Sequence, residues 1–145
     1  MKIGGLNDPI QMRSIDAVRS FLSRFQALDP DQASIRWPNI WVEDNRLVID
    51  RGENHTTIRE FLGALYEHGF VRDFDWVAWQ WRAVRFVDDP KLLEKARLIT
   101  CIKLLTLHAR KERFVDGHFA SMTQAGHITA ILNRISEMSQ TKRKL

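Results

Sequence analysis

Apolar residues recur every three or four positions over most of this chain, and short polar or glycine-containing segments separate the runs. This spacing is typical of helices that bury one face. Apart from a longer run near the middle, the predicted helices cover residues 14–28, 57–68, 76–87, 118–125 and 127–138.

Residues of the types that begin and end helices flank these runs. Side chains that can accept a hydrogen bond from a free N–H of the first turn are Ser14, Thr56 or Thr57, Asp75 and Asp116. Glycines that can take the left-handed conformation after a last turn are Gly69 and Gly126. We expect Asp29-Pro30 to end the first helix, since proline cannot continue one.

The longest run, residues 90–109, is predicted to form the central helix of the fold. It begins with Pro90 after two aspartates, a typical first helical residue. Its second half, Leu98 to Leu107, is apolar on every side apart from Lys103. A helix of this kind must be covered on nearly all faces, so we expect it to lie in the core.

The pattern changes to short β-prone runs at 40–42 and 47–49, separated by Glu43-Asp44-Asn45-Arg46. This predicts a hairpin. The expected fold is therefore mainly α: a single-domain bundle of about five to six helices around residues 90–109, with one short β-hairpin near 40–49. Residues 1–13 are expected to be a loose leader, residues 14–138 the helical domain, and residues 139–145 a basic tail.

Composition narrows the class of protein. A chain of 145 residues with 44% apolar content can bury a core of its own. The lone cysteine, Cys101, excludes an internal disulfide and a paired-cysteine metal site. No uncharged run approaches membrane length, so we expect a cytoplasmic protein without a membrane partner. The net charge of +4 allows nucleic-acid binding but does not favour it.

Trp76, Trp79 and Trp81 fall within six residues, which is more aromatic area than one helix face normally buries. They could stack on nucleic-acid bases or bind a protein partner. Stacking surfaces usually alternate aromatic and basic residues, whereas Arg82 and Arg85 follow the cluster here. We therefore expect the tryptophans to pack between the neighbouring helices.

The most polar segment, from His108 to His118, contains the candidate site residues. Arg110 and Arg113 could hold an anion, and Asp116 and His118 have the side chains of acid–base catalysis. No metal-binding spacing and no phosphate-binding or nucleophile motif occurs, so we predict no metal, no cofactor and no catalytic residue. A network of ion pairs and helix caps is the favoured interpretation.

Three sequence segments together resemble a family of small bacterial domains of unknown function: FDW-x-x-W at Phe74 to Trp79, LLT-x-x-x-R-x-E-R-F-x-D-G-H at Leu104 to His118, and GHI-x-x-IL-x-RI at Gly126 to Ile135. The resemblance implies a single helical domain and no particular reaction. It also implies that Trp76, Trp79, Thr106, Arg110, Arg113, Phe114, Gly117, His118 and Gly126 belong to the family signature.

Five tryptophans and eight phenylalanines exceed what one small core needs. We therefore predict a non-catalytic binding or interaction module that self-associates or binds a protein partner. Two alternatives remain open. One is DNA binding by a helix-turn-helix-like pair at 118–138. The other is an enzyme, which would bring Arg110, Asp116 and His118 together in an open cleft.

Overall fold

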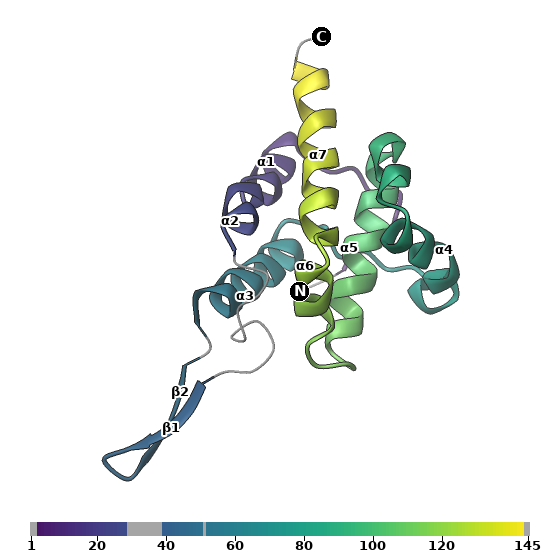
Figure 1. Cartoon of the computed structure of the whole chain (residues 1–145). Coiled ribbons are helices and arrows are strands. Elements are labelled where there is room, and N and C mark those ends of the chain that lie inside the picture. Colours follow the sequence, from purple (N-terminus) through teal and green to yellow (C-terminus); the bar gives the residue numbers. More distant parts are fainter. Residues whose placement is uncertain (1–2, 29–38, 51, 144–145) are drawn as a thin grey trace.

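The computed structural model describes residues 3–28, 39–50 and 52–143, and within them the fold is mainly α with one two-stranded hairpin, as predicted. In chain order the elements are α1 (Met12–Arg19), α2 (Leu22–Gln26), β1 (Asn39–Glu43), β2 (Arg46–Asp50), α3 (Gly52–Glu67), α4 (Trp76–Asp88), the 3₁₀ helix η2 (Pro90–Lys95), α5 (Leu98–Glu112), α6 (His118–Gln124) and α7 (His127–Arg143). The helices form one bundle, from which the hairpin projects (Figure 1).

Two helices share the centre of the bundle. In α5, one buried stretch runs from Leu104 to Ala109, and Cys101 and Ile102 are buried in the turn before it. In α7, Ile128, Ile131, Leu132 and Ile135 are fully buried. Helix α7 contacts α1, α2, η2, α5 and α6. It therefore lies among these elements instead of covering one side of the bundle. The regular apolar spacing in its sequence is explained by this central position.

The prediction of one helix over residues 90–109 is wrong at its first half. Pro90–Lys95 is a 3₁₀ helix, and Ala96 and Arg97 are extended, with ψ angles of 143° and 160°. The Ala96 carbonyl accepts a hydrogen bond from Nε of Arg134 at 2.8 Å, so it is used outside the helix. A continuous helix would give that carbonyl to the backbone N–H of Thr100, which bonds Arg97 instead.

The first predicted helix also divides. It begins at Met12, two residues before the predicted cap Ser14, and Gln11 holds the cap position without a side-chain bond. The helix ends at Arg19, and α2 begins at Leu22 after the two non-helical residues Ser20 and Phe21. The predicted stop at Asp29-Pro30 lies outside the described residues.

The cap predictions for α3 and α4 had different outcomes. Helix α3 begins at Gly52, so the predicted caps Thr56 and Thr57 lie inside it and that prediction is wrong. The stop at Gly69 is confirmed: its φ is +72°, and the N–H of Phe70 bonds the carbonyl of Leu65 across it. Asp75 caps α4, as predicted, by accepting a bond from the N–H of Ala78.

The hairpin matches the predicted one. β1 and β2 pair antiparallel from Asn39 opposite Asp50 to Glu43 opposite Arg46. Asp44 and Asn45 form the two-residue turn, with φ angles of 50° and 61°. Positive φ at both positions is typical of the tight turns that suit twisted hairpins.

Residues 3–11, the described part of the predicted leader 1–13 that precedes α1, contact the bundle. The N–H of Asp73 bonds the carbonyl of Gly4 at 2.8 Å. The guanidinium of the buried Arg72 donates to the carbonyls of Gly5 and Asp8, both at 2.9 Å. The N-terminal segment is therefore attached beside the start of α4.

Candidate functional site

The predicted site residues do not gather at one place. Arg110, on α5, lines a hollow of about 340 Å³ together with Arg72, Asp73 and Trp76. His118 lines a different pocket, described below. Arg113 and Asp116 are exposed and line neither pocket. The open cleft that the enzyme alternative requires of Arg110, Asp116 and His118 is therefore not formed.

Trp76 and Trp79 are half-buried, and other aromatic rings cover them. Trp76 stacks on Phe114 with ring centroids 6.2 Å apart. Trp79 stacks on Phe86 at 6.4 Å, and Phe74 meets it edge-on at 6.0 Å. These two tryptophans therefore pack against the protein, as expected. The same expectation is wrong for Trp81, whose indole is 85% exposed.

Three histidines from three helices meet between α5, α6 and α7. The Nδ1 atom of His108 lies 2.9 Å from Nε2 of His118. The ring of His127 meets that of His108 edge-on, with centroids 5.0 Å apart. Two of them follow the same local structure. Gly117 and Gly126 have φ angles of +86° and +81°, and each precedes a histidine that begins a helix.

Glu112 holds the turn that presents His118. Its two carboxylate oxygens accept hydrogen bonds from the N–H of Gly117 at 3.0 Å and of Phe119 at 2.7 Å. The predicted cap Asp116 makes no such bond: Gly117 holds the cap position and Glu112 satisfies the free N–H groups, so that prediction is wrong. A carboxylate here also suits the positive end of the helix.

Burial keeps the three imidazoles neutral. It holds the pKa of His108 well below its usual 6.5, and His127, His118 and Lys111 lower it further. Burial, then Lys111, lowers the pKa of His118 to about 4. Burial, then His118, lowers that of His127 to about 4. Each neutral ring has one N–H, so the short His108–His118 bond contains one proton that either ring can donate.

Two imidazole atoms in this cluster are buried without a partner among the described residues: Nε2 of His108 and Nε2 of His127. An unpaired buried polar atom costs free energy, so such atoms are uncommon in structural cores. Within the described ranges, no group of three or more histidine, cysteine, aspartate or glutamate side chains is placed to hold a metal ion.

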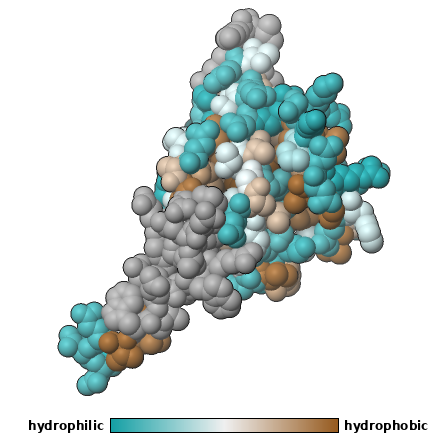
Figure 2. Space-filling view, in the orientation of Figure 1, coloured by the Kyte–Doolittle hydropathy of each residue, from teal (hydrophilic) through white to brown (hydrophobic). Residues whose placement is uncertain are grey.

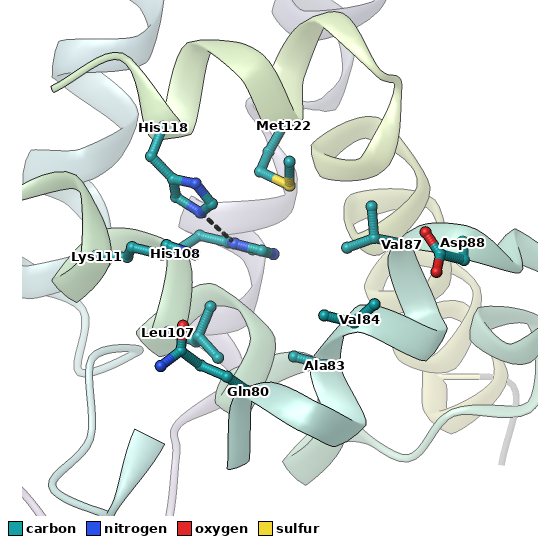
Figure 3. Close-up of a pocket in the computed structure, with 10 residues that line it drawn as sticks. All are labelled: Gln80, Ala83, Val84, Val87, Asp88, Leu107, His108, Lys111, His118 and Met122. Atoms are coloured by element: carbon teal, nitrogen blue, oxygen red, sulfur yellow. Dashed lines mark hydrogen bonds between the residues drawn. The ribbon is translucent and has the colours of Figure 1, made fainter. Parts of the chain in front are cut away.

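His108 and His118 form the polar end of a pocket between α4, α5 and α6, with a volume of about 150 Å³ (Figure 3). Its apolar wall consists of Ala83, Val84, Val87, Leu107 and Met122. Its other polar lining residues are Gln80, Asp88 and Lys111. In Figure 3 the ring of His108 extends from α5 towards the space between Met122 and Val87. The unpaired nitrogen therefore lies at a cavity.

An exposed apolar stripe on α4 runs beside this pocket. The side chains of Val77, Trp81 and Val84 are 57%, 85% and 52% exposed. Their spacing of four and three residues places them on one face of the helix. Apolar residues reach the surface on the α4 side of the bundle and on the hairpin (Figure 2).

Cys101 is not a nucleophile in this structure. It is fully buried, and burial raises the pKa of its thiol to about 12 although Arg134 acts in the opposite direction. The thiolate is the reactive form, and it is absent at neutral pH.

Comparison with known proteins identifies a family but no activity. A family model described as a family of unknown function, DUF6508, matches residues 10–141. The chain belongs to that family, as its sequence segments indicated. No curated protein and no solved structure matches the chain significantly. No described helix is long and apolar enough to cross a membrane.

Proposed function

We propose that this DUF6508 protein is a non-catalytic interaction module that self-associates through the exposed face of α4. The observation that carries the proposal is the indole of Trp81, which is 85% exposed at the centre of an apolar stripe. Tryptophan is the residue type most enriched among those that dominate binding at protein interfaces. A surface of this kind usually has a binding role.

The stripe suits a second copy of itself. Val77 lies four residues before Trp81 and Val84 three residues after it. A two-fold axis near Trp81 would therefore set Val77 of one copy opposite Val84 of the other, with the helices antiparallel. Most homodimers use such an isologous arrangement, in which the same surface of both subunits meets.

The area available indicates a weak dimer. An aromatic side chain buries roughly 150–250 Å², and a stable interface buries about 800 Å² on each partner. Phe114, which is 76% exposed and stacks on Trp76, extends the apolar surface beyond Val77. We expect a dissociation constant in the micromolar range, about 1 to 100 µM.

The DNA-binding alternative has less support from the geometry of α7. In a helix-turn-helix the second helix presents the residues near its start to the major groove. His127 is only 5% exposed. Arg134 bonds the Ala96 carbonyl and pairs with Glu137 at 3.6 Å, so its guanidinium is already engaged.

Sedimentation equilibrium over about 1 to 100 µM tests the proposal. The wild-type chain is expected to dimerise, and Trp81→Gln to weaken dimerisation at least about tenfold, the loss expected for a central interface tryptophan. Leu47→Gln is the matched control, because Leu47 is 67% exposed but lies on the hairpin. A monomeric wild type, or a dimer that Trp81→Gln leaves unchanged, would contradict the proposal. Duplex binding that weakens with salt would support the DNA alternative instead.

A further inference from the structure

The histidine pocket has features that self-association through α4 does not explain. Its polar end contains the unpaired Nε2 of His108, a residue only 2% exposed. Its wall is apolar, and its rim contains one cation, Lys111, and one carboxylate, Asp88. We propose that this pocket binds a small carboxylate with a compact apolar body, and that Lys111 and His108 recognise its head.

The volume limits the size of the body. A cavity of about 150 Å³ lined by apolar side chains accommodates a molecule about as large as benzene. Val84, Val87 and Met122 surround the space in front of His108 in Figure 3. An aromatic ring or a short branched chain matches this wall, whereas a sugar or a nucleotide is too large and too polar for it.

The charges favour an anionic head. Lys111 lines the pocket and lies close enough to lower the pKa of both His108 and His118. No carboxylate in the described part of the chain forms an ion pair with it. Asp88 lies beyond Val87, on the side opposite Lys111 (Figure 3). The imidazole end of the pocket is therefore positive, and a carboxylate there would form an ion pair shielded from water.

The histidine pair can supply a hydrogen bond to such a head. When Nε2 of His118 donates to Nδ1 of His108, the second nitrogen of His108 must hold its proton. That Nε2–H then points at the pocket as a donor for a carboxylate oxygen. The opposite tautomer presents a lone pair, which would repel an anion. The His108–His118 pair is neutral in either tautomer. Binding of a carboxylate therefore selects the tautomer in which Nε2 of His108 has the proton.

Three probes of nearly equal size and different charge test the inference on the full chain near neutral pH: benzoate, benzamide and benzylamine. Imidazole ¹⁵N spectra report both occupancy and tautomer. Benzoate is expected to bind at least about tenfold more tightly than benzamide, with benzylamine weakest. Saturation with benzoate is expected to leave Nε2 of His108 fully protonated.

Lys111→Met separates head recognition from simple filling of the cavity. It keeps most of the apolar stem and removes the charge. Benzoate affinity is expected to fall about tenfold while benzamide affinity stays the same. Lys91→Met, the same substitution on η2 outside the pocket, is the control and is expected to change neither.

Four results would overturn the inference: no binding of any probe, equal affinity for all three, tightest binding of benzylamine, or benzoate binding that Lys111→Met leaves unchanged. None of these results tests the proposed dimer, because dimerisation is measured without ligand, by sedimentation of the wild type and of Trp81→Gln. Conversely, a monomeric protein that binds benzoate through Lys111 would refute the proposed dimer and retain the pocket.

Discussion

The Nε atom of Arg134 donates to the carbonyl of Ala96 at 2.8 Å, across 38 residues of sequence. This bond joins the central helix α7 to the extended corner between η2 and α5. The acceptor is the carbonyl that a longer helix would have paired with the N–H of Thr100.

Arg134→Met should therefore destabilise the fold. A hydrogen bond from a charged donor contributes about 1.5–3 kcal/mol, and the variant keeps most of the apolar stem while losing the donor. Urea unfolding measures the change. Arg113→Met, at an exposed arginine, is the control and should stay within about 0.5 kcal/mol of the wild type. A stability equal to the wild type in Arg134→Met would mean that the corner is held by packing alone.

The position of this break shows what the sequence could and could not predict. The apolar spacing of α7 and the helix-end residues Gly69, Asp75 and Gly126 are local signals, and each predicts the element that is observed. Only the end of α7 differs: the helix continues to Arg143, into the predicted basic tail 139–145. At the division of residues 90–109, the carbonyl of Ala96 bonds Arg134, which is distant in sequence. Nothing within the run itself indicates it, because Pro90 and the apolar positions suit one continuous helix equally well.

The histidine cluster was missed for a similar reason. His108, His118 and His127 lie on three helices, and their spacing matches no metal-binding or catalytic motif. One signal was present: the dipeptide Gly-His occurs at residues 117–118 and again at 126–127. Two left-handed glycines that each begin a helix with histidine direct both rings toward the same side of α5.

Thr106, a residue of the family signature, has a structural role. Its buried hydroxyl donates to the carbonyl of Phe70 at 2.9 Å and accepts from the N–H of Arg72 at 3.1 Å. Thr106→Val should cost about 2–4 kcal/mol, because the equally bulky variant leaves two buried backbone groups unpaired. Thr106→Ser keeps the hydroxyl and should cost about 1 kcal/mol for the lost methyl group. Equal losses in the two variants would show that the hydroxyl is dispensable.

His108→Phe should stabilise the protein by about 1 kcal/mol, as measured by urea unfolding. The substitution removes a buried unpaired nitrogen, whose desolvation costs about 1–3 kcal/mol, and keeps a planar ring. His118 loses its partner but is only half-buried, so water can replace that bond. Residues retained for binding often reduce stability. A loss of more than about 1 kcal/mol would instead assign His108 a structural role.

Stability should fall as the pH is lowered from 6.5 towards 4, because His118 and His127 have folded pKa values of about 4, below their usual 6.5. In this window the unfolded chain binds more protons than the folded one, so protons favour unfolding. His127 alone should account for about 3 kcal/mol between pH 7 and pH 4. Most carboxylates titrate near pH 4, so the slope between pH 5 and 6.5 reports the histidines.

Urea unfolding at several pH values measures this slope, and His127→Leu is the variant that assigns it. The variant removes one of the titrating imidazoles. Between pH 5 and 6.5, the number of protons taken up on unfolding, which sets the slope of the unfolding free energy against pH, should therefore fall by about one. Because its side chain is apolar and the site is buried, the loss of stability on acidification should shrink even if the stability at pH 7 also changes. A wild type whose stability is constant from pH 7 to pH 5 would show that the rings are solvated and titrate normally, and the neutral histidine pair on which the pocket depends would then be refuted.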